Sequence, residues 1–444
     1  MAGRIRGTVV AVAGAALLGS GLVAAPAGAG GGDEPLEATE IGVTADAIRI
    51  AVIADVDNPV RPGLFRGSRD GVLAAAEFIN DNGGLAGRQV EVDFIDSRLS
   101  GDEARSALIQ ACEEDFAIVG TTALFMNNID PAVSCPDLAG TVTGLPDVPV
   151  LQTEFAHQCS PISYPIIVVG LDCTTLDDPE QTFRTGQGHV KYHLGTQEED
   201  LHGVWTIASD LPATIRAATP PVRGAQKAGI GRDDEIQISG LATQTEYTPV
   251  VQSIKQNNST YVANYLDYRG MVLLRKEAAI QGVDSVVVWD CTLACYDQRF
   301  IEEGGEDVEG TYVTVTFVPF EEAKQNASIR NYLEYVGEDN ADAFGAQAWA
   351  AGLFFRDVVN AIVAADGENG LTRAAFLEQA ADIHDFTAEV DGEGMLAPTD
   401  VGGRKVKGCG AVLQVRDGEF VRRSPKKKGT LNCGDVVKVT IDLA

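Results

Sequence analysis

The side chains of this sequence that could carry chemistry are few, and their spacing favours binding over catalysis. Five histidines are present, and His189 and His193 stand four residues apart, where one helix face could present both to a metal ion. We interpret this pair as an ordinary polar helix face and expect no metal site. The dinucleotide, phosphate-loop, zinc-protease and serine-hydrolase motifs are all absent. With 64 Asp and Glu residues, no chosen pair indicates an acid–base site. We therefore expect no enzymatic activity and no cofactor.

A binding cleft needs polar groups at the carboxyl ends of strands in place of a nucleophile. In the first part of the chain, the sequence Val119-Gly-Thr-Thr-Ala123 is read as the end of a strand and the start of a helix. Its backbone N–H groups and threonine hydroxyls suit a carboxylate, or the threonines simply cap the helix. The first loop could wall the ligand with apolar surface, although its phenylalanine fits the core equally well. The candidates in this part are Pro62, Phe65, Thr121, Thr122, Ala123 and Thr153.

A second set of polar residues follows the strands expected at 203–208, 260–264 and 284–288. An acid at the end of the last strand can contact a ligand or act as the N-cap of a helix. The candidates in this part are Ser209, Asp210, Tyr265, Asp267, Tyr268 and Asp290.

The elements that must position these residues alternate between strand and helix patterns, which predicts an α/β fold with two Rossmann-like lobes around parallel sheets. Lobe one is expected to comprise 46–184 plus 323–386, and lobe two 185–316 plus 403–444. Crossings near 184–190, 317–322 and 386–402 would form a three-stranded hinge. The expected strands are 48–54, 89–95, 116–120, 148–153, 203–208, 235–239, 260–264, 284–289 and 312–317, with a hairpin at 411–423. The expected helices are 64–80, 102–114, 212–228, 248–256, 269–281, 326–337, 341–365 and 372–382.

The N-terminus carries the pattern of an export signal over residues 1–29. Arg4 and Arg6 precede an apolar run, and small residues at 25–29 offer cleavage sites. An uncleaved membrane anchor is the alternative, but the run consists of small side chains and is a weak span. Residues 30–45 are expected to form a flexible tail. We expect an extracellular or cell-envelope location, without a cysteine at the cleavage site to carry a lipid.

The net charge of −30 excludes two classes of partner, because it repels nucleic acid and anionic lipid surfaces. The one basic run, Lys426–Lys428, is interpreted as a solvated turn, and a monomer is expected.

Eight cysteines in an exported chain predict disulfides rather than metal sites. Many pairings are possible, and we favour pairs between sequence neighbours. These are Cys112–Cys135, Cys159–Cys173, Cys291–Cys295 and Cys409–Cys433.

Three stretches together resemble a known family over most of the chain. Residues 79–97, INDNGGLAGRQVEVDFIDS, resemble the IN-x-x-GG-[IL]-x-GR-x-[IVL] signature of extracytoplasmic solute-binding proteins of the branched-chain amino acid ABC importer type. Residues 344–362 and 400–421 are similar to the late helix and last crossing of these type I periplasmic binding proteins. The resemblance implies a small polar ligand, an amino acid or related compound, that is delivered to an ABC importer permease. A ligand-sensing protein acting with a membrane receptor is the alternative.

The resemblance also implies roles for particular residues of the second part. It places an aromatic ligand contact in the Tyr265–Tyr268 loop and an acid that faces an α-ammonium group near Asp290.

Overall fold

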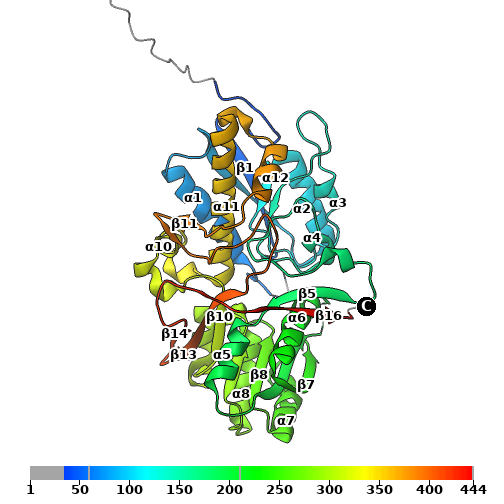
Figure 1. Cartoon of the computed structure of the whole chain (residues 1–444), viewed down its shortest axis with the longest axis vertical. Helices are drawn as coiled ribbons and strands as arrows, with labels where there is room; N and C mark the ends of the chain where they lie inside the picture. The colour runs from blue at the N-terminus through cyan, green and yellow to red at the C-terminus, as the bar shows by residue number, and fades with distance from the viewer. Residues whose placement is uncertain (1–34, 59–60, 210–211, 443–444) are drawn as a thin grey trace, which may run out of the picture. The chain divides into compact units, whose positions relative to one another are not determined.

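The computed structural model describes residues 35–58, 61–209 and 212–442. The expected export signal, the beginning of the expected tail and the candidate Asp210 lie outside the described residues. The described chain contains two main sheets with helices on their faces. Figure 1 shows the strands of the first sheet and its early helices in blue and cyan, its later helices in yellow and orange, and most of the second sheet in green.

The first sheet is parallel and has the order β2-β1-β3-β4. Its central strand β1 alternates between two cores, as the period of two in a strand requires. Ile50 and Val52 join the cluster that contains α1 and α11, whereas Ala51 and Ile53 join the cluster that contains α2. The strands are β1 (Ala47–Ala54), β2 (Gln89–Asp96), β3 (Ala117–Val119) and β4 (Asp147–Val148). The early helices are α1 (Arg66–Asp81), α2 (Gly101–Glu114), α3 (Asp130–Val133) and α4 (Phe155–Gln158).

Three later helices return to the first sheet: α10 (Ala327–Val336), α11 (Ala343–Asp366) and α12 (Arg373–Ala381). Small residues let α11 approach α1 closely, since a Cβ on Gly71 would lie 2.2 Å from the carbonyl oxygen of Gly345. Helix α11 is long and apolar enough to cross a membrane by composition alone. Most of its residues are buried in lobe one, so it is accounted for as a core helix.

The second sheet has the order β14-β13-β10-β9-β8-β6-β7, and β15 pairs with β13. Strands β7, β6, β8, β9 and β10 are parallel, while β13 and β14 add an antiparallel hairpin. The strands are β6 (His202–Ala208), β7 (Gly231–Ile238), β8 (Tyr261–Tyr265), β9 (Val288–Cys291), β10 (Tyr312–Val315), β13 (Cys409–Arg416), β14 (Glu419–Ser424) and β15 (Asn432–Cys433). The helices are α5 (Gly188–Thr196), α6 (Pro212–Ala228), α7 (Thr248–Asn257), α8 (Tyr268–Ile280) and α9 (Gln298–Gly304).

The chain crosses between the lobes after β5 (Gln181–Gly186), after β10 and before β13. Phe317 and Leu396 form an antiparallel bridge between the last two crossings. Strand β16 (Val436–Ile441) pairs with β5 along all six residues, so the end of the chain reinforces the first crossing. A short hairpin, β11 (Glu389–Val390) and β12 (Glu393–Gly394), precedes the third crossing. The predicted two-lobed α/β fold is therefore confirmed.

Two predicted strands that bear on the candidate site differ from the structure, and the strand predicted at 235–239 begins four residues earlier, at Gly231. The run predicted as strand 148–153 pairs only at β4, so residues 149–153 form a loop at the end of the first sheet. The strand predicted at 284–289 lies instead at 288–291, because pairing with β8 and β10 sets its position. In this register Asp290 is paired with Ala263 of β8 and Tyr312 of β10. Asp290 therefore belongs to the strand instead of following it.

All four predicted disulfides are present: Cys112–Cys135, Cys159–Cys173, Cys291–Cys295 and Cys409–Cys433. Residues 36–44 of the expected tail are anchored to lobe one. The Thr39 hydroxyl donates to the Leu371 carbonyl over 2.6 Å, and the buried Arg88 guanidinium donates to the carbonyl oxygens of Glu37 and Thr44.

Candidate functional site

A cavity of about 180 Å³ lies at the carboxyl ends of the central strands of the second sheet. These ends form the edge from which the chain crosses to lobe one, where open α/β sheets bind ligands. Helices α5 and α6 each add a residue to its wall. The lining residues are His189, Pro221, Ala263, Asn264, Tyr265, Asp290, Cys291, Thr292, Leu293 and Thr314.

Asp290 is the only carboxylate among the described residues that line this cavity, and its side chain is 8% exposed. One carboxylate oxygen accepts a hydrogen bond of 2.6 Å from the Tyr261 hydroxyl. The other lies 3.9 Å from Nε2 of His193. The interpretation of Asp290 as a helix N-cap is wrong, because the residue is inside β9 and its carboxylate bonds to a tyrosine of the next strand.

His193 is fully buried, and neither ring nitrogen has a hydrogen-bond partner. Burial lowers its pKa to about 4, although nearby Asp290 acts in the opposite direction. The imidazole is therefore neutral near pH 7, and its ring packs edge-on against Tyr312 with a centroid distance of 4.8 Å. The expected polar helix face is wrong for His193, whereas His189 lines the cavity. Among the described residues, no cluster of His, Cys, Asp and Glu is arranged to hold a metal ion.

The other candidates of lobe two are divided between this cavity and other contacts. Tyr265 lines the cavity. Asp267 caps α8 by accepting from the backbone N–H of Gly270 over 3.0 Å. Tyr268 is turned toward α9, where its hydroxyl donates to Glu303 over 2.9 Å. Ser209 is exposed at the end of β6.

The threonine candidates of lobe one are buried, and the hydroxyls of two of them bond within the lobe, whereas the Thr122 hydroxyl has no hydrogen-bond partner. The Thr121 hydroxyl donates to Asp147 over 3.1 Å, and the Thr153 hydroxyl donates to the Leu124 carbonyl over 2.7 Å. Thr122 and Ala123 are almost completely buried. The expectation that a helix begins here is wrong, because residues 120–129 form turns and a single bridge, and α3 begins only at Asp130. The capping role is therefore excluded.

An apolar cluster stands at the strand ends of lobe one. Phe65 is 5% exposed and packs edge-on against Phe344, with a centroid distance of 4.9 Å. Pro62 is exposed in the same loop. We call this group the lobe-one apolar cluster: Ala54, Val56, Leu64, Phe65, Leu99, Leu124, Phe125, Leu151 and Phe344. Six of its members are half-buried, which leaves apolar surface at the edge that carries the lobe-to-lobe contacts.

Among the described residues, two ion pairs join the lobes beside the strand ends, and no sequence pattern predicted either. Nε of Arg61, from the loop after β1, lies 3.1 Å from Asp267 of lobe two, and the same guanidinium donates to the Gly240 carbonyl. Nη2 of Arg216, on α6, lies 2.5 Å from Glu154 of lobe one. Glu154 directly follows the candidate Thr153, but nothing in its sequence context indicates a partner in the other lobe.

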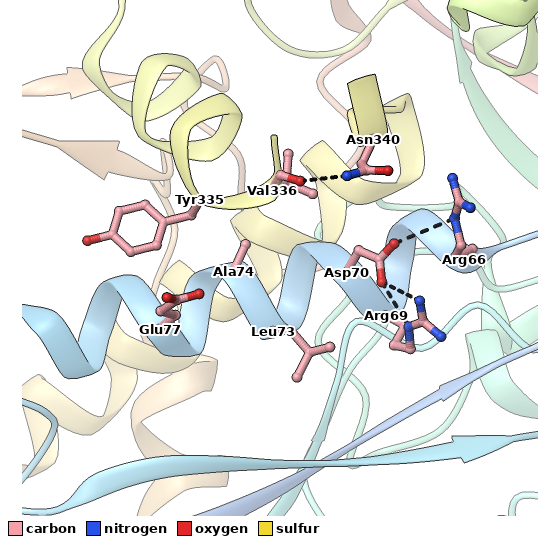
Figure 2. A pocket seen from close by; sticks show the side chains of 9 residues that line it. All are labelled: Arg66, Arg69, Asp70, Leu73, Ala74, Glu77, Tyr335, Val336 and Asn340. Atoms are coloured by element: carbon pink, nitrogen blue, oxygen red, sulfur yellow. Dashed lines mark hydrogen bonds and ion pairs between the residues drawn. The ribbon is translucent and has the colours of Figure 1, made fainter. Parts of the chain in front are cut away.

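Two larger grooves lie on lobe one alone. Figure 2 shows the first, of about 380 Å³, between α1 and the end of α10. Its cations are already paired, since Arg69 lies 2.7 Å and Arg66 3.6 Å from Asp70. The second, of about 390 Å³, lies between α2 and α3. Neither lies at the strand ends, so we favour the smaller cavity of lobe two as the ligand site.

Comparison with known proteins shows a family match and several similar solved structures. A family model described as periplasmic binding protein matches residues 173–419, whereas no curated protein matches. A leucine-binding protein LivK from Thermotoga maritima is 17% identical with a TM-score of 0.63, over 85% of this chain and 98% of that one. A fatty acid ABC transporter substrate-binding protein from Thermomonospora curvata is 14% identical with a TM-score of 0.64, over 90% and 94%. A putative branched-chain amino acid ABC transporter from Rhodospirillum rubrum is 15% identical with a TM-score of 0.56, over 85% and 100%.

At these identities the solved structures show the fold alone, and the family rests on the matched sequence model. That match covers more than half of the chain. The protein belongs to the periplasmic binding protein family and has the type I periplasmic binding fold.

Proposed function

We propose that this protein captures a small polar ligand, an amino acid or related compound, between its two lobes outside the cytoplasm and delivers it to an ABC importer. The observation that carries the proposal is the cavity at the strand ends of lobe two, with Asp290 and Tyr265 in its wall. Two ion pairs bring loops of lobe one to lobe two beside these strand ends. A ligand held there would contact both lobes and favour the conformation in which they approach.

Asp290 and Tyr265 are the proposed ligand contacts of lobe two, and Pro62 is the proposed contact from the first loop of lobe one. The expected carboxylate site at Thr121 and Thr122 receives no support from their contacts. The proposal of a permease partner is supported by the family resemblance, and we assign no surface of this chain to it.

A thermal-shift screen of the processed, disulfide-bonded chain tests ligand capture. The compounds are amino acids, amines, small amides, short carboxylates and sugars. A ligand at about 100 times its Kd adds about 2.7 kcal/mol of stability, which raises the Tm of a chain this long by about 3–5 °C. Silence across the panel would reject small-molecule capture.

Delivery to an importer needs a separate test in the producing cell. Deleting the gene should abolish uptake of the radiolabelled hit, and restoring the wild-type chain should recover it. Normal uptake in the deletion strain would favour the sensing alternative.

A further inference from the structure

The charge around the lobe-two cavity has one sign. Among the described residues that line it, Asp290 is the only carboxylate and no lysine or arginine is present. The other polar groups are the imidazole of His189, the amide of Asn264, the Tyr265 phenol and two threonine hydroxyls. A negatively charged ligand group would therefore meet Asp290 without a guanidinium or ammonium group to offset the repulsion.

Among the described residues of lobe two, no lysine or arginine pairs with the negative charge of Asp290. Its hydrogen bond from Tyr261 comes from a neutral phenol. The buried His193 beside it is uncharged near pH 7, because its pKa is lowered to about 4. A carboxylate that is more than nine-tenths buried needs a compensating charge, and a cationic ligand group can provide it.

At the strand ends of lobe one, internal carboxylates already take up backbone N–H groups that could bind an anion. Asp55 accepts from the N–H groups of Leu99 and Leu124, over 2.7 and 2.8 Å. Asp96 accepts from the N–H groups of Val56 and Asp57, over 3.1 and 2.7 Å. The Thr121 and Thr153 hydroxyls donate within the lobe, and the Thr122 hydroxyl has no hydrogen-bond partner but is fully buried. None of these described groups is therefore both exposed and free to bind a ligand carboxylate.

Lobe one instead offers apolar surface at this edge. The half-buried members of the lobe-one apolar cluster come from the loops after β1, β2, β3 and β4 and from the beginning of α11. Two of these loops carry the lobe-to-lobe contacts, through Arg61 and Glu154. The arginines of these two ion pairs are not free for a ligand anion, since Arg61 pairs with Asp267 and Arg216 pairs with Glu154.

From this distribution of charge and apolar surface, we infer that the ligand is a small amine with an apolar body and no carboxylate. Its ammonium group binds Asp290, and its hydrocarbon part lies against the lobe-one apolar cluster. The inference rests on the proposed function and narrows the ligand class within it.

Three probes with one carbon skeleton separate the charges. They are leucine, 3-methylbutan-1-amine, which is leucine without its carboxylate, and 4-methylpentanoate, which is leucine without its amine. Titration calorimetry of the processed chain near pH 7 should find the amine bound at least tenfold more tightly than leucine, and no binding of 4-methylpentanoate. Tighter binding of leucine or 4-methylpentanoate than of the amine would overturn the inference.

Two variants locate the ammonium site. Asp290→Asn should weaken amine binding at least tenfold. Glu302→Gln, which removes the same charge from an exposed position on α9, should bind as the wild type does. Equal amine affinities in both variants would overturn the assignment to Asp290. Circular dichroism and Tm measurements on both variants check that they are folded.

The results also separate this inference from the proposed function. If a carboxylate, a sugar or a zwitterion raises Tm while amines do not, capture stands and the amine class is wrong. If no compound of the wider panel binds, the proposed function fails together with the inference.

Discussion

The Arg61–Asp267 and Arg216–Glu154 ion pairs between the lobes allow a prediction about the free energy of lobe association. Arg61 and Asp267 have side chains that are 21% and 23% exposed, and Arg216 and Glu154 are 24% and 13% exposed. An exposed salt bridge stabilises a protein by about 0–1 kcal/mol, and a hydrogen bond to a charged group by about 1.5–3 kcal/mol. Because both pairs are partly buried, we expect the stabilising free energy of each to lie between these two ranges. Removing both arginines should therefore cost about 2–3 kcal/mol of lobe association. Since each 1.4 kcal/mol is about tenfold, the ratio of joined to separated lobes should fall about 30- to 140-fold.

Small-angle X-ray scattering can measure this change as an increase in the radius of gyration. The test protein is the double variant Arg61→Ala/Arg216→Ala. The matched control is Arg223→Ala, which removes another arginine of α6 whose partner, Glu235, lies 2.6 Å away within lobe two. The control should scatter as the wild type does. An unchanged radius of gyration in the double variant would refute the reasoning, as would an equal increase in the control.

Three further predictions concern stability in urea unfolding. Burial, with nearby Asp93 adding to it, raises the pKa of Asp115 to about 8, and neither carboxyl oxygen has a hydrogen-bond donor. Because the folded-state pKa of Asp115 is raised, the contribution of its carboxyl group to the free energy of unfolding is present at about pH 4 and is lost as the pH rises to about 8. Asp115→Asn should therefore be as stable as the wild type at about pH 4. At about pH 8 it should be more stable than the wild type, by at most about 6 kcal/mol. A pH-independent difference would contradict this. Arg373 is fully buried, and its guanidinium group donates to backbone carbonyl oxygens around the Cys112–Cys135 disulfide. Arg373→Met should therefore lower the free energy of unfolding by about 3 kcal/mol or more. A loss below about 1 kcal/mol would show that those carbonyl oxygens find other donors. Glu322→Gln should cost about 3–5 kcal/mol because it leaves the buried Arg422 charge unpaired, whereas replacing both residues by leucine should cost less; a larger loss in the double variant would contradict this.

Local pattern was sufficient for the order of elements and for most of their bounds. Helix 212–228 and the beginnings of strands 89–96 and helix 248–257 lie where the sequence predicts them. Hydrophobic periodicity and the Gly and Pro residues between segments act over a few neighbouring residues, so a sequence displays them directly. The disulfide pairs could also be predicted from the sequence, because each joins two cysteines that follow one another along the chain.

The errors arose where a segment's environment depends on distant strands. The apolar run before Asp290 reads as strand, but pairing with β8 and β10 moves the strand to 288–291. His193 has a polar side chain on a short helix, yet that helix packs it beneath the sheet beside Tyr312. The sequence predicts Thr121 as a ligand contact, but its hydroxyl donates to the carboxylate of Asp147, from a neighbouring strand.

The sequence by itself determined an α/β chain of two lobes, its disulfides and the family to which it belongs, because these depend on composition, periodicity and short motifs. Only the tertiary structure decided which charges are already paired. Arg61 pairs with Asp267, Arg216 pairs with Glu154, and Asp290 has no lysine or arginine partner among the described residues of its lobe. The physical reason is that an ion pair depends on separation in space, and the residues that neutralise or expose a ligand site come from loops far apart in the chain.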